Sequence, residues 1–201
     1  MQSSKKSKLV IFDLDGTIVD SLEANYGLFK TVFEQFSLDV PSRNEFRQMF
    51  DKNFYISLKN KVGKKTYDKM IPPFKKIYDD KYNAPAFKGM THLVNSLPNT
   101  AIISSNFEKA IKRALKSNHI RTGKILGADK ETSKVKKIKS CKAKAILVSD
   151  SIGDILEGKK AGVKTVGVTW GYSKNIKKGK PNYIVNSVSE LNKCLKTITK
   201  Y

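Results

Sequence analysis

A short apolar run that ends in two acids is the feature of this sequence that most constrains its fold. Residues 9–12 are four consecutive apolar residues, which is typical of a strand buried on both faces of a parallel sheet. Asp13 and Asp15 follow this run. Gly16 then permits a sharp turn, and Thr17 adds a hydroxyl group. Ligands of open parallel sheets bind at the carboxyl ends of the strands. The run therefore predicts a site for a metal ion and an anion at the end of the first strand.

Strand and helix patterns alternate over most of the remaining chain. Further apolar strand patterns, with helical patterns between most of them, lie at residues 100–104, 124–126, 145–149, 165–169 and 183–185. This alternation predicts an α/β fold with a doubly wound, Rossmann-like parallel sheet and right-handed crossovers.

One long segment carries no strand pattern. Residues 21–84 show only the helical spacing of apolar residues. Pro72-Pro73 are expected to break the last of these helices into two pieces. We therefore predict an inserted, all-helical cap domain at residues 21–84 and a core domain made of residues 1–20 and 85–201.

Composition limits the class of protein. No segment approaches the roughly 20 apolar residues that are needed to span a bilayer, and residues 1–8 contain no apolar stretch of signal-peptide length. Cys141 and Cys194 form no metal-ligand pattern, so we expect reduced thiols in a cytoplasmic protein. We expect no membrane partner, and either a monomer or a homodimer.

The net charge is unusually high for a soluble protein. It is +21, and it comes from 35 lysines and only 4 arginines against 18 acidic residues. Surfaces that bind nucleic acid often use arginine for bidentate and stacked contacts, so this ratio argues against nucleic acid as the partner. Three interpretations stay open: a general bias toward lysine, electrostatic attraction of anionic substrates, or binding of a polyanion, whose phosphates lysine can contact.

Polar residues also follow two later strands. Ser104, Ser105 and Asn106 lie at the end of one strand and just before a helix, where hydroxyl and N–H groups can bind phosphate. The same residues could simply cap the helix. Asp150 and Asp154 follow a later buried run. Since Mg²⁺ prefers oxygen ligands, these two acids predict a metal site in the same crevice.

These clusters resemble the motifs of the haloacid dehalogenase-like superfamily, in which an apolar strand is followed by Asp-x-Asp-x-Thr. The nearest subgroup is the phosphoglycolate phosphatase-like one, which has a small helical cap. The resemblance implies that Asp13 is the nucleophile that takes up a phosphoryl group, and that Asp15 is the general acid that later activates water. It also implies a Mg²⁺ ion bound by Asp13, the backbone carbonyl of Asp15 and Asp150, with Asp154 assisting. Thr17 is assigned to phosphate binding.

The resemblance further implies one hydroxyl residue and one lysine that contact the phosphoryl group. Ser104 fits the first role best, with Ser105 as the alternative. Lys134 fits the second role best, with Lys130 as the alternative. The other lysines of this region are expected to form a solvated face: Lys136, Lys137, Lys139, Lys142 and Lys144.

A turn in the predicted cap has the position of the family's specificity loop. Its residues Lys52 and Asn53 are candidates for substrate contact, although ordinary turn residues would give the same pattern. Hinges of the cap are expected near residues 19–22 and 84–88.

These motifs together predict a magnesium-dependent phosphatase. Its substrate would be a small phosphorylated metabolite, phosphoglycolate-like or a sugar phosphate, and the reaction would pass through an aspartyl-phosphate. One alternative is a sugar phosphomutase of the same family, which commonly has a His where this chain has Asn25. The other is a non-catalytic protein that binds a polyanion or nucleic acid through its basic surface.

Overall fold

The computed structural model describes residues 7–141 and 144–199. The expectations for residues 1–6 and for Lys142 lie outside the described residues. No helix in the described part of the chain combines the length and the apolar character needed to cross a membrane. Localisation and oligomeric state stay predictions.

The core is a parallel sheet of six strands in the order β3-β2-β1-β4-β5-β6. The strands are β1 (Leu9–Phe12), β2 (Thr100–Ile103), β3 (Lys124–Leu126), β4 (Ala145–Ser149), β5 (Lys164–Val168) and β6 (Tyr183–Val185). The chain winds outward from β1 in both directions, so the strand order reverses between β1 and β4. Ligands of such sheets bind at this switch point. The predicted doubly wound parallel fold is confirmed.

The register of the sheet brings the ends of its three central strands level. Phe12 of β1 pairs with Ile102 of β2 on one side and with Val148 of β4 on the other. The segments that follow these strands therefore reach the same edge of the sheet. They carry the acids and hydroxyl groups that the sequence analysis singled out.

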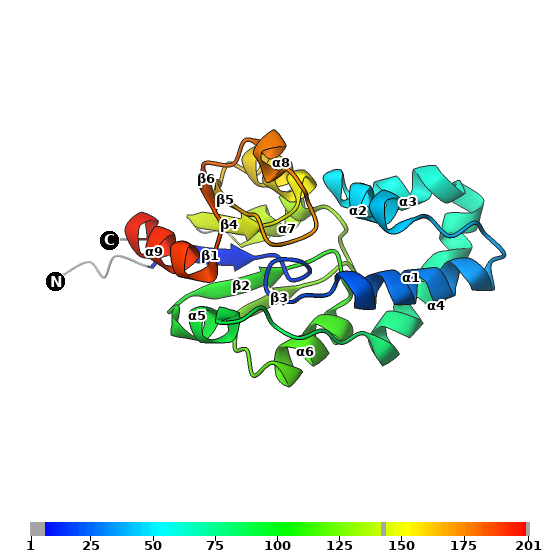
Figure 1. Cartoon of the computed structure of the whole chain (residues 1–201), viewed down its shortest axis with the longest axis horizontal. Coiled ribbons are helices and arrows are strands. Elements are labelled where there is room, and N and C mark those ends of the chain that lie inside the picture. Colours follow the sequence, from blue (N-terminus) through cyan, green and yellow to red (C-terminus); the bar gives the residue numbers. More distant parts are fainter. Residues whose placement is uncertain (1–6, 142–143, 200–201) are drawn as a thin grey trace.

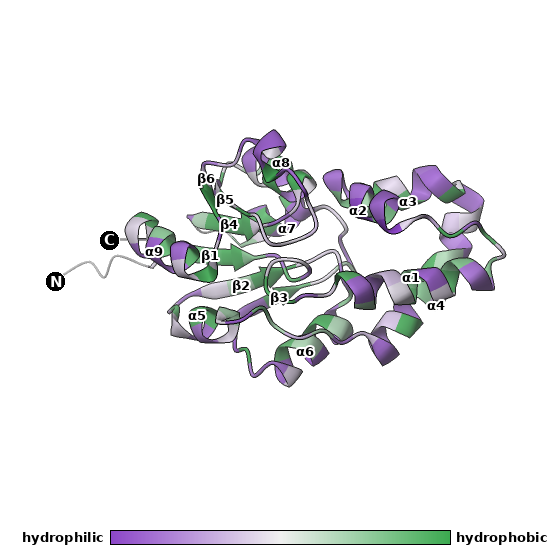
Figure 2. Cartoon of the chain, viewed as in Figure 1, coloured by the Kyte–Doolittle hydropathy of each residue, from purple (hydrophilic) through white to green (hydrophobic). Residues whose placement is uncertain are grey.

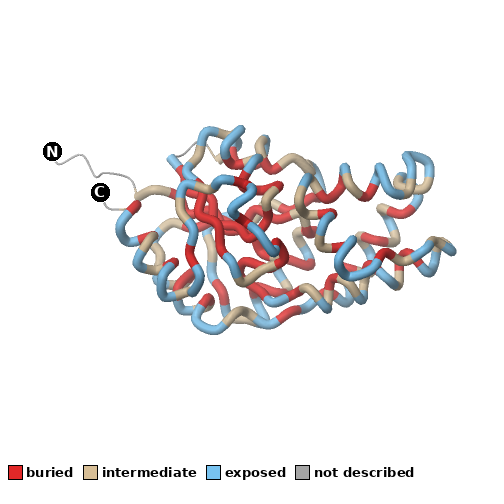
Figure 3. The backbone as a smooth tube through the Cα atoms, turned by 45° about the horizontal axis from the view of Figure 1, so that its top comes forward, coloured by how far each residue is buried: buried red, intermediate tan, exposed pale blue. Residues whose placement is uncertain are grey.

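Helices cover both faces of the sheet (Figure 1). They are α5 (Met90–Ser96), α6 (Glu108–Ser117), α7 (Lys134–Ser140), α8 (Ile152–Lys160), the short 3₁₀ helix η2 (Ile176–Gly179) and α9 (Val188–Ile198). Successive side chains of a strand point to opposite faces. Val10 and Phe12 accordingly pack in one core with α5, α6 and α9, whereas Leu9 and Ile11 pack in a second core with Ile138 of α7. The central strands are apolar in Figure 2 and buried in Figure 3.

Only helices lie between β1 and α5 in the described chain, beyond the carboxyl ends of the strands (Figure 1). They are α1 (Leu22–Gln35), α2 (Arg43–Gln48), the 3₁₀ helix η1 (Met49–Asp51), α3 (Phe54–Val62) and α4 (Lys64–Lys81). Ser42 and Glu45 form the capping box that begins α2. The inserted helical block is confirmed and is called the cap below. Its boundaries at residues 21 and 84 stay a prediction.

The prediction that Pro72-Pro73 would break the last cap helix is wrong, because α4 is continuous from Lys64 to Lys81. Proline in a helix interior removes a hydrogen bond and crowds the preceding turn. Met70, Phe74 and Tyr78, however, form one buried stripe along α4 that spans the two prolines. The helix packs against α1, α3 and α6. Packing along this stripe offsets the loss of backbone hydrogen bonds.

The two linkers between core and cap run side by side. Val19 forms an antiparallel bridge with Ala86. The N–H of Asp20 donates to the Pro85 carbonyl at 2.8 Å, and the N–H of Phe87 donates to the Ile18 carbonyl at 2.9 Å. The chain therefore leaves and re-enters the core at one place, which is where the hinges are predicted.

Candidate active site

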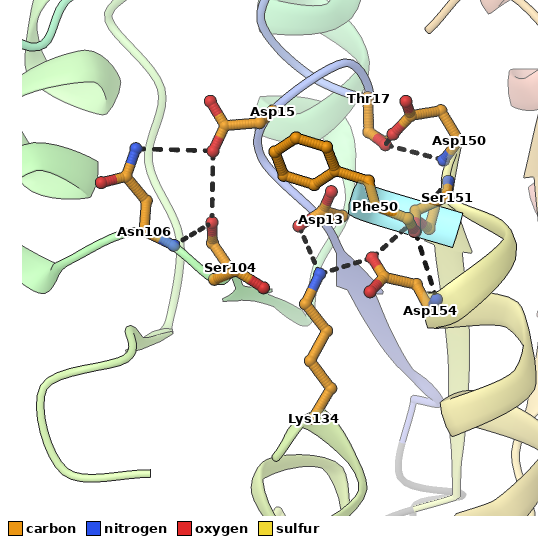
Figure 4. Close-up of polar contacts among 12 residues, drawn as sticks. Asp13, Asp15, Thr17, Phe50, Ser104, Asn106, Lys134, Asp150, Ser151 and Asp154 are labelled. Atoms are coloured by element: carbon orange, nitrogen blue, oxygen red, sulfur yellow. Dashed lines mark hydrogen bonds and ion pairs between the residues drawn. The ribbon is translucent and has the colours of Figure 1, made fainter. Parts of the chain in front are cut away.

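A buried lysine joins two of the acids at the end of the sheet (Figure 4). Lys134 is the first residue of α7 and is 2% exposed. Its Nζ donates to Asp13 Oδ1 at 2.7 Å and also to Asp154 Oδ2. Burial disfavours the ammonium form, but the charges of Asp13 and Asp154 outweigh this and raise the pKa of Lys134 above its ordinary value. Lys134 is therefore a cation held against the first acid of the chain.

Asp13 keeps one carboxylate oxygen free of protein partners. Its Oδ1 is paired with Lys134, whereas Oδ2 accepts no hydrogen bond from any described residue. Asp13 also lines the cavity between the core and the cap. A carboxylate with one neutralised oxygen and one free oxygen on a cavity is arranged to act as a nucleophile.

Asp150 also lines this cavity, and both of its carboxylate oxygens accept hydrogen bonds. Thr17 Oγ1 donates to its Oδ1 at 2.8 Å, and the N–H of Tyr172 donates to its Oδ2 at 2.6 Å. Gly16 and Gly171 leave room for it, since a Cβ at either position would lie 2.4 or 2.3 Å from Asp150 Oδ2. Gly16 also has a φ of +74°. The structure thus places Thr17 on Asp150, and the phosphate contact predicted for Thr17 stays a prediction.

The side chain of Asp15 is held chiefly by residues of the cap and its linkers. Its Oδ1 accepts from Ser21 Oγ at 2.7 Å, Asn25 Nδ2 at 2.7 Å and Tyr82 OH at 2.6 Å. The Tyr172 hydroxyl lies 2.8 Å from both Ser21 Oγ and Asn25 Nδ2. Because Ser21 and Tyr82 flank the cap, the position of Asp15 depends on the position of the cap.

The segment after β2 reaches the same cavity, which Ser104 and Ser105 both line. Ser104 Oγ donates to Asp15 Oδ2 at 3.4 Å and accepts from the N–H of Asn106 at 3.0 Å. Asn106 Nδ2 also lies 3.5 Å from Asp15 Oδ2, and its Oδ1 accepts from the N–H of Phe107. The structure therefore brings Ser104 and Asn106 to Asp15, while their binding of phosphate stays a prediction.

The structure distinguishes between the two lysines that could contact the phosphoryl group. Lys134 contacts Asp13, whereas Lys130 is exposed. It also corrects the prediction that the remaining lysines form a solvated face. Lys136, Lys139 and Lys144 are exposed, but Lys137 is only 3% exposed. Lys137 lies one helical turn after Lys134 and points to the same side of α7.

The cap closes the site with the residues around η1. Ser151 Oγ donates to the Phe50 carbonyl at 2.6 Å, and the Phe50 ring lines the cavity (Figure 4). Lys52 has an exposed side chain, and both Lys52 and Asn53 line the cavity. Asn53 Oδ1 accepts from two N–H groups at the start of α3, and its Nδ2 donates to the Thr132 carbonyl at 3.1 Å. Asn53 thus caps α3 and ties the cap to the core, and substrate contact by Lys52 and Asn53 stays a prediction.

The closed cavity is small. Its volume is about 20 Å³, which is room for about one water molecule. With the cap in this position, the space beside Asp13 is too small for a phosphorylated molecule. The paired linkers at Val19 and Ala86 are the segments that would bend to open the cap.

Acids outnumber buried cations around Asp13. Burial raises the pKa of Asp13 well above its ordinary value; Lys134 opposes this rise, and the charges of Asp154, Asp150 and Asp15 reinforce it. Burial also raises the pKa of Asp150 to about 6. A cation placed between these carboxylates would favour their charged forms.

The donor chemistry of the site fits Mg²⁺. This ion takes oxygen ligands, usually one or two carboxylates, and retains several waters. Asp13, Asp150 and the backbone carbonyl of Asp15 could supply the protein ligands. Among the residues that the structure describes, no three His, Cys, Asp or Glu side chains form a group that could hold a metal ion. Asp154 is committed to Lys134 and accepts from Ser149 Oγ at 2.8 Å, so its part in metal binding stays a prediction.

Several residues of this site are not predicted by the sequence. Tyr82 and Tyr172 carry no motif, and only the fold brings their hydroxyl groups to the network around Asp15. Phe50 follows a helical pattern that is also typical of a core residue. Asn25 was noted only as a departure from a mutase pattern, yet it donates directly to Asp15. Lys137 could have been found, because helical spacing places residues three apart on one face.

Comparison with known proteins gives matches over most of the chain. Residues 10–168 match the family model described as haloacid dehalogenase-like hydrolase. The chain is 22% identical to the pyrophosphatase PpaX of Oceanobacillus iheyensis, over 92% of this chain and 94% of the relative. It is 23% identical to a phosphoglycolate phosphatase of Aquifex aeolicus, over 94% and 96%. A crystal structure of a predicted phosphatase from Clostridium acetobutylicum shares the fold, with a TM-score of 0.80 at 23% identity over 95% of this chain and 99% of that one.

Proposed function

Because the chain belongs to the haloacid dehalogenase-like hydrolase family, we propose that it is a magnesium-dependent phosphatase that acts on a small phosphorylated metabolite. The observation that carries the proposal is the state of Asp13. One of its oxygens is paired with buried Lys134 at 2.7 Å, and the other has no partner among the described residues and faces the cavity. Phosphoryl transfer needs a nucleophile of this kind.

The proposed reaction has two steps. A free Asp13 oxygen attacks phosphorus, the bond from phosphorus to the leaving oxygen breaks, and Asp15 gives that oxygen a proton. Water then attacks the phosphorus of phosphorylated Asp13 and passes a proton to Asp15. The bond between phosphorus and the Asp13 oxygen breaks, so inorganic phosphate is released and the Asp13 carboxylate is restored. Lys134 stabilises the negative charge of Asp13 and of the phosphoryl oxygens. Ser104, whose hydroxyl donates to Asp15 at 3.4 Å, would turn to donate to one of those oxygens when substrate is bound.

Magnesium would be held by Asp13, the backbone carbonyl of Asp15 and Asp150. It would reduce the repulsion between the carboxylate nucleophile and the phosphate dianion. Thr17 and the N–H of Tyr172 hold both oxygens of Asp150 in fixed positions for this role. Asp154 fixes Lys134 from the side opposite Asp13.

The charge of the molecule and the nearness of the cap to Asp13 favour a small anionic substrate, which would enter once the cap has opened. The cap leaves only about 20 Å³ when closed, so a bulky leaving group would keep it open. Relatives named pyrophosphatase and phosphoglycolate phosphatase suggest pyrophosphate and 2-phosphoglycolate as the first compounds to test, followed by sugar phosphates. The net charge of +21 would raise the encounter rate with such anions.

The test is phosphate release from a panel of these compounds. We expect turnover with Mg²⁺, none with EDTA, and a loss of at least about 10³-fold in Asp13→Asn because the nucleophile is removed. Asp39→Asn changes the same chemical group at an exposed cap position and should retain full activity. Conversion of one sugar phosphate into its isomer without phosphate release would instead identify a mutase. A folded protein that releases no phosphate but binds oligonucleotides tightly at physiological salt would refute the phosphatase.

A further inference from the structure

A second buried lysine lies beside the site without a carboxylate partner. Lys137 Nζ donates to the carbonyl of Ser104 at 2.7 Å and to the carbonyl of Gly127 at 3.2 Å. No described acid forms an ion pair with it, although the side chain is only 3% exposed. Burial, together with the nearby charge of Lys134, lowers the pKa of Lys137 to about 8. Burying an ammonium group without a counter-ion is unfavourable, so its position calls for a functional explanation.

The two carbonyls that Lys137 contacts end neighbouring strands, but other hydrogen bonds already join these segments. The N–H of Ser104 donates to the Leu126 carbonyl at 3.1 Å, and the N–H of Ala128 donates to the Asn106 carbonyl at 2.9 Å. Lys137 is therefore not needed to connect the ends of β2 and β3. What it adds is the orientation of one peptide group, the one between Ser104 and Ser105.

The geometry of the peptide group between Ser104 and Ser105 fixes the direction of the Ser105 N–H. The described chain has no cis peptide bond, and in a trans peptide the carbonyl and the following N–H point in opposite directions. With the Ser104 carbonyl turned toward Lys137, the N–H of Ser105 points away from Lys137. Ser105 lines the cavity, and its N–H donates to no described residue. An unpartnered N–H on the cavity is suited to bind an oxyanion.

We propose that Lys137 is a positioning residue, which holds the Ser104–Ser105 peptide so that the Ser105 N–H donates to a phosphoryl oxygen of the substrate. This inference rests on the proposed phosphatase function. Lys137 does not touch the substrate and acts only through this peptide. A neutral Lys137 amine could still donate to both carbonyls, so the positioning role does not require its charge.

The test compares Lys137→Met with Lys139→Met. Both changes remove one ammonium from α7, but Lys139 is exposed. We expect Lys137→Met to lower kcat about 10- to 100-fold with a smaller change in KM, since loss of one oxyanion donor costs about 10²–10³ in kcat. Lys139→Met should match the unchanged protein. Lys137→Arg retains donors and should recover part of kcat.

A direct readout is the amide resonance of Ser105 during titration with inorganic phosphate and Mg²⁺. It should shift strongly in the unchanged protein and in Lys139→Met, and much less in Lys137→Met. An unmoved Ser105 amide in the unchanged protein would overturn the proposal even if Lys137→Met failed to fold. So would equal kcat values for the two Met variants. Absence of phosphate release by the unchanged protein would refute the phosphatase itself, which is a separate result.

Discussion

Replacement of Lys137 by Met should make the difference in stability between the two proteins depend on pH in a defined direction. The pKa of Lys137 is about 8 in the folded protein, against an ordinary value of 10.5. Between these values the unfolded chain holds a proton on this lysine that the folded protein has released. Stability rises with pH wherever the unfolded state binds more protons, so the unchanged protein should gain stability relative to Lys137→Met as the pH rises through 8.

The size of this gain follows from the same two pKa values. One proton of difference changes the free energy of unfolding by about 1.4 kcal/mol per pH unit. The difference is about half a proton at pH 8, is nearly complete near pH 9 and declines again as the pH approaches 10.5. We therefore expect the unchanged protein to gain about 2 kcal/mol over Lys137→Met between pH 7 and pH 10.

The assay is urea unfolding at pH 7, 8, 9 and 10 for the unchanged protein, Lys137→Met and Lys139→Met. Buried tyrosines with raised pKa values, among them Tyr82 and Tyr172, destabilise every variant alike at high pH and cancel in the comparison. Lys139→Met should show no such trend. A gap between the unchanged protein and Lys137→Met that stays constant, or moves in the opposite direction, would refute the argument that Lys137 is buried without a counter-ion.

Three further changes test the cap and its contacts. Gly153→Ala should lower kcat/KM at least about tenfold, because its Cβ would lie 2.6 Å from the Lys52 carbonyl oxygen and would hold the cap open. The control is Gly27→Ala, whose Cβ meets nothing within 4 Å and which should keep full activity. Tyr82→Phe removes a 2.6 Å hydrogen bond to Asp15 and should lower kcat about tenfold while costing only about 1 kcal/mol of stability. An unchanged kcat would exclude Tyr82 from holding Asp15. Pro72→Ala restores a helical N–H at an exposed position of α4. We expect it to raise the free energy of unfolding, measured by urea titration, by about 1–3 kcal/mol. A loss of stability would show that Pro72 fits α4 without strain.

Much of the site could be predicted because the parallel sheet ties sequence position to spatial position. Asp13, Ser104 and Asp150 follow strands that end at the same edge of the sheet. Each apolar run in the sequence therefore predicts that the polar residue after it lies in the crevice. Gly16 likewise marked a turn that needs a positive φ.

The parts that were missed depend on packing between distant segments. Nothing near Tyr82 or Tyr172 in the sequence indicates that their hydroxyl groups share a network with Ser21 and Asn25. Lys137 was mistaken for a surface residue because it lies in a run of lysines, and composition there outweighed its helical position. The prolines of α4 were given their usual effect, which the buried stripe of that helix overrides.

If Asp13 carries the phosphoryl group during the reaction, an acid quench during turnover should trap the phosphorylated residue. The protein would be mixed with para-nitrophenyl phosphate and Mg²⁺, quenched in acid during turnover, digested and analysed by mass spectrometry. We expect one added phosphoryl group on the peptide that contains Asp13. It should be absent with EDTA and in Asp13→Asn, and present in Asp39→Asn. Sustained turnover with no phosphoryl group on that peptide, or full activity of Asp13→Asn, would contradict this role of Asp13.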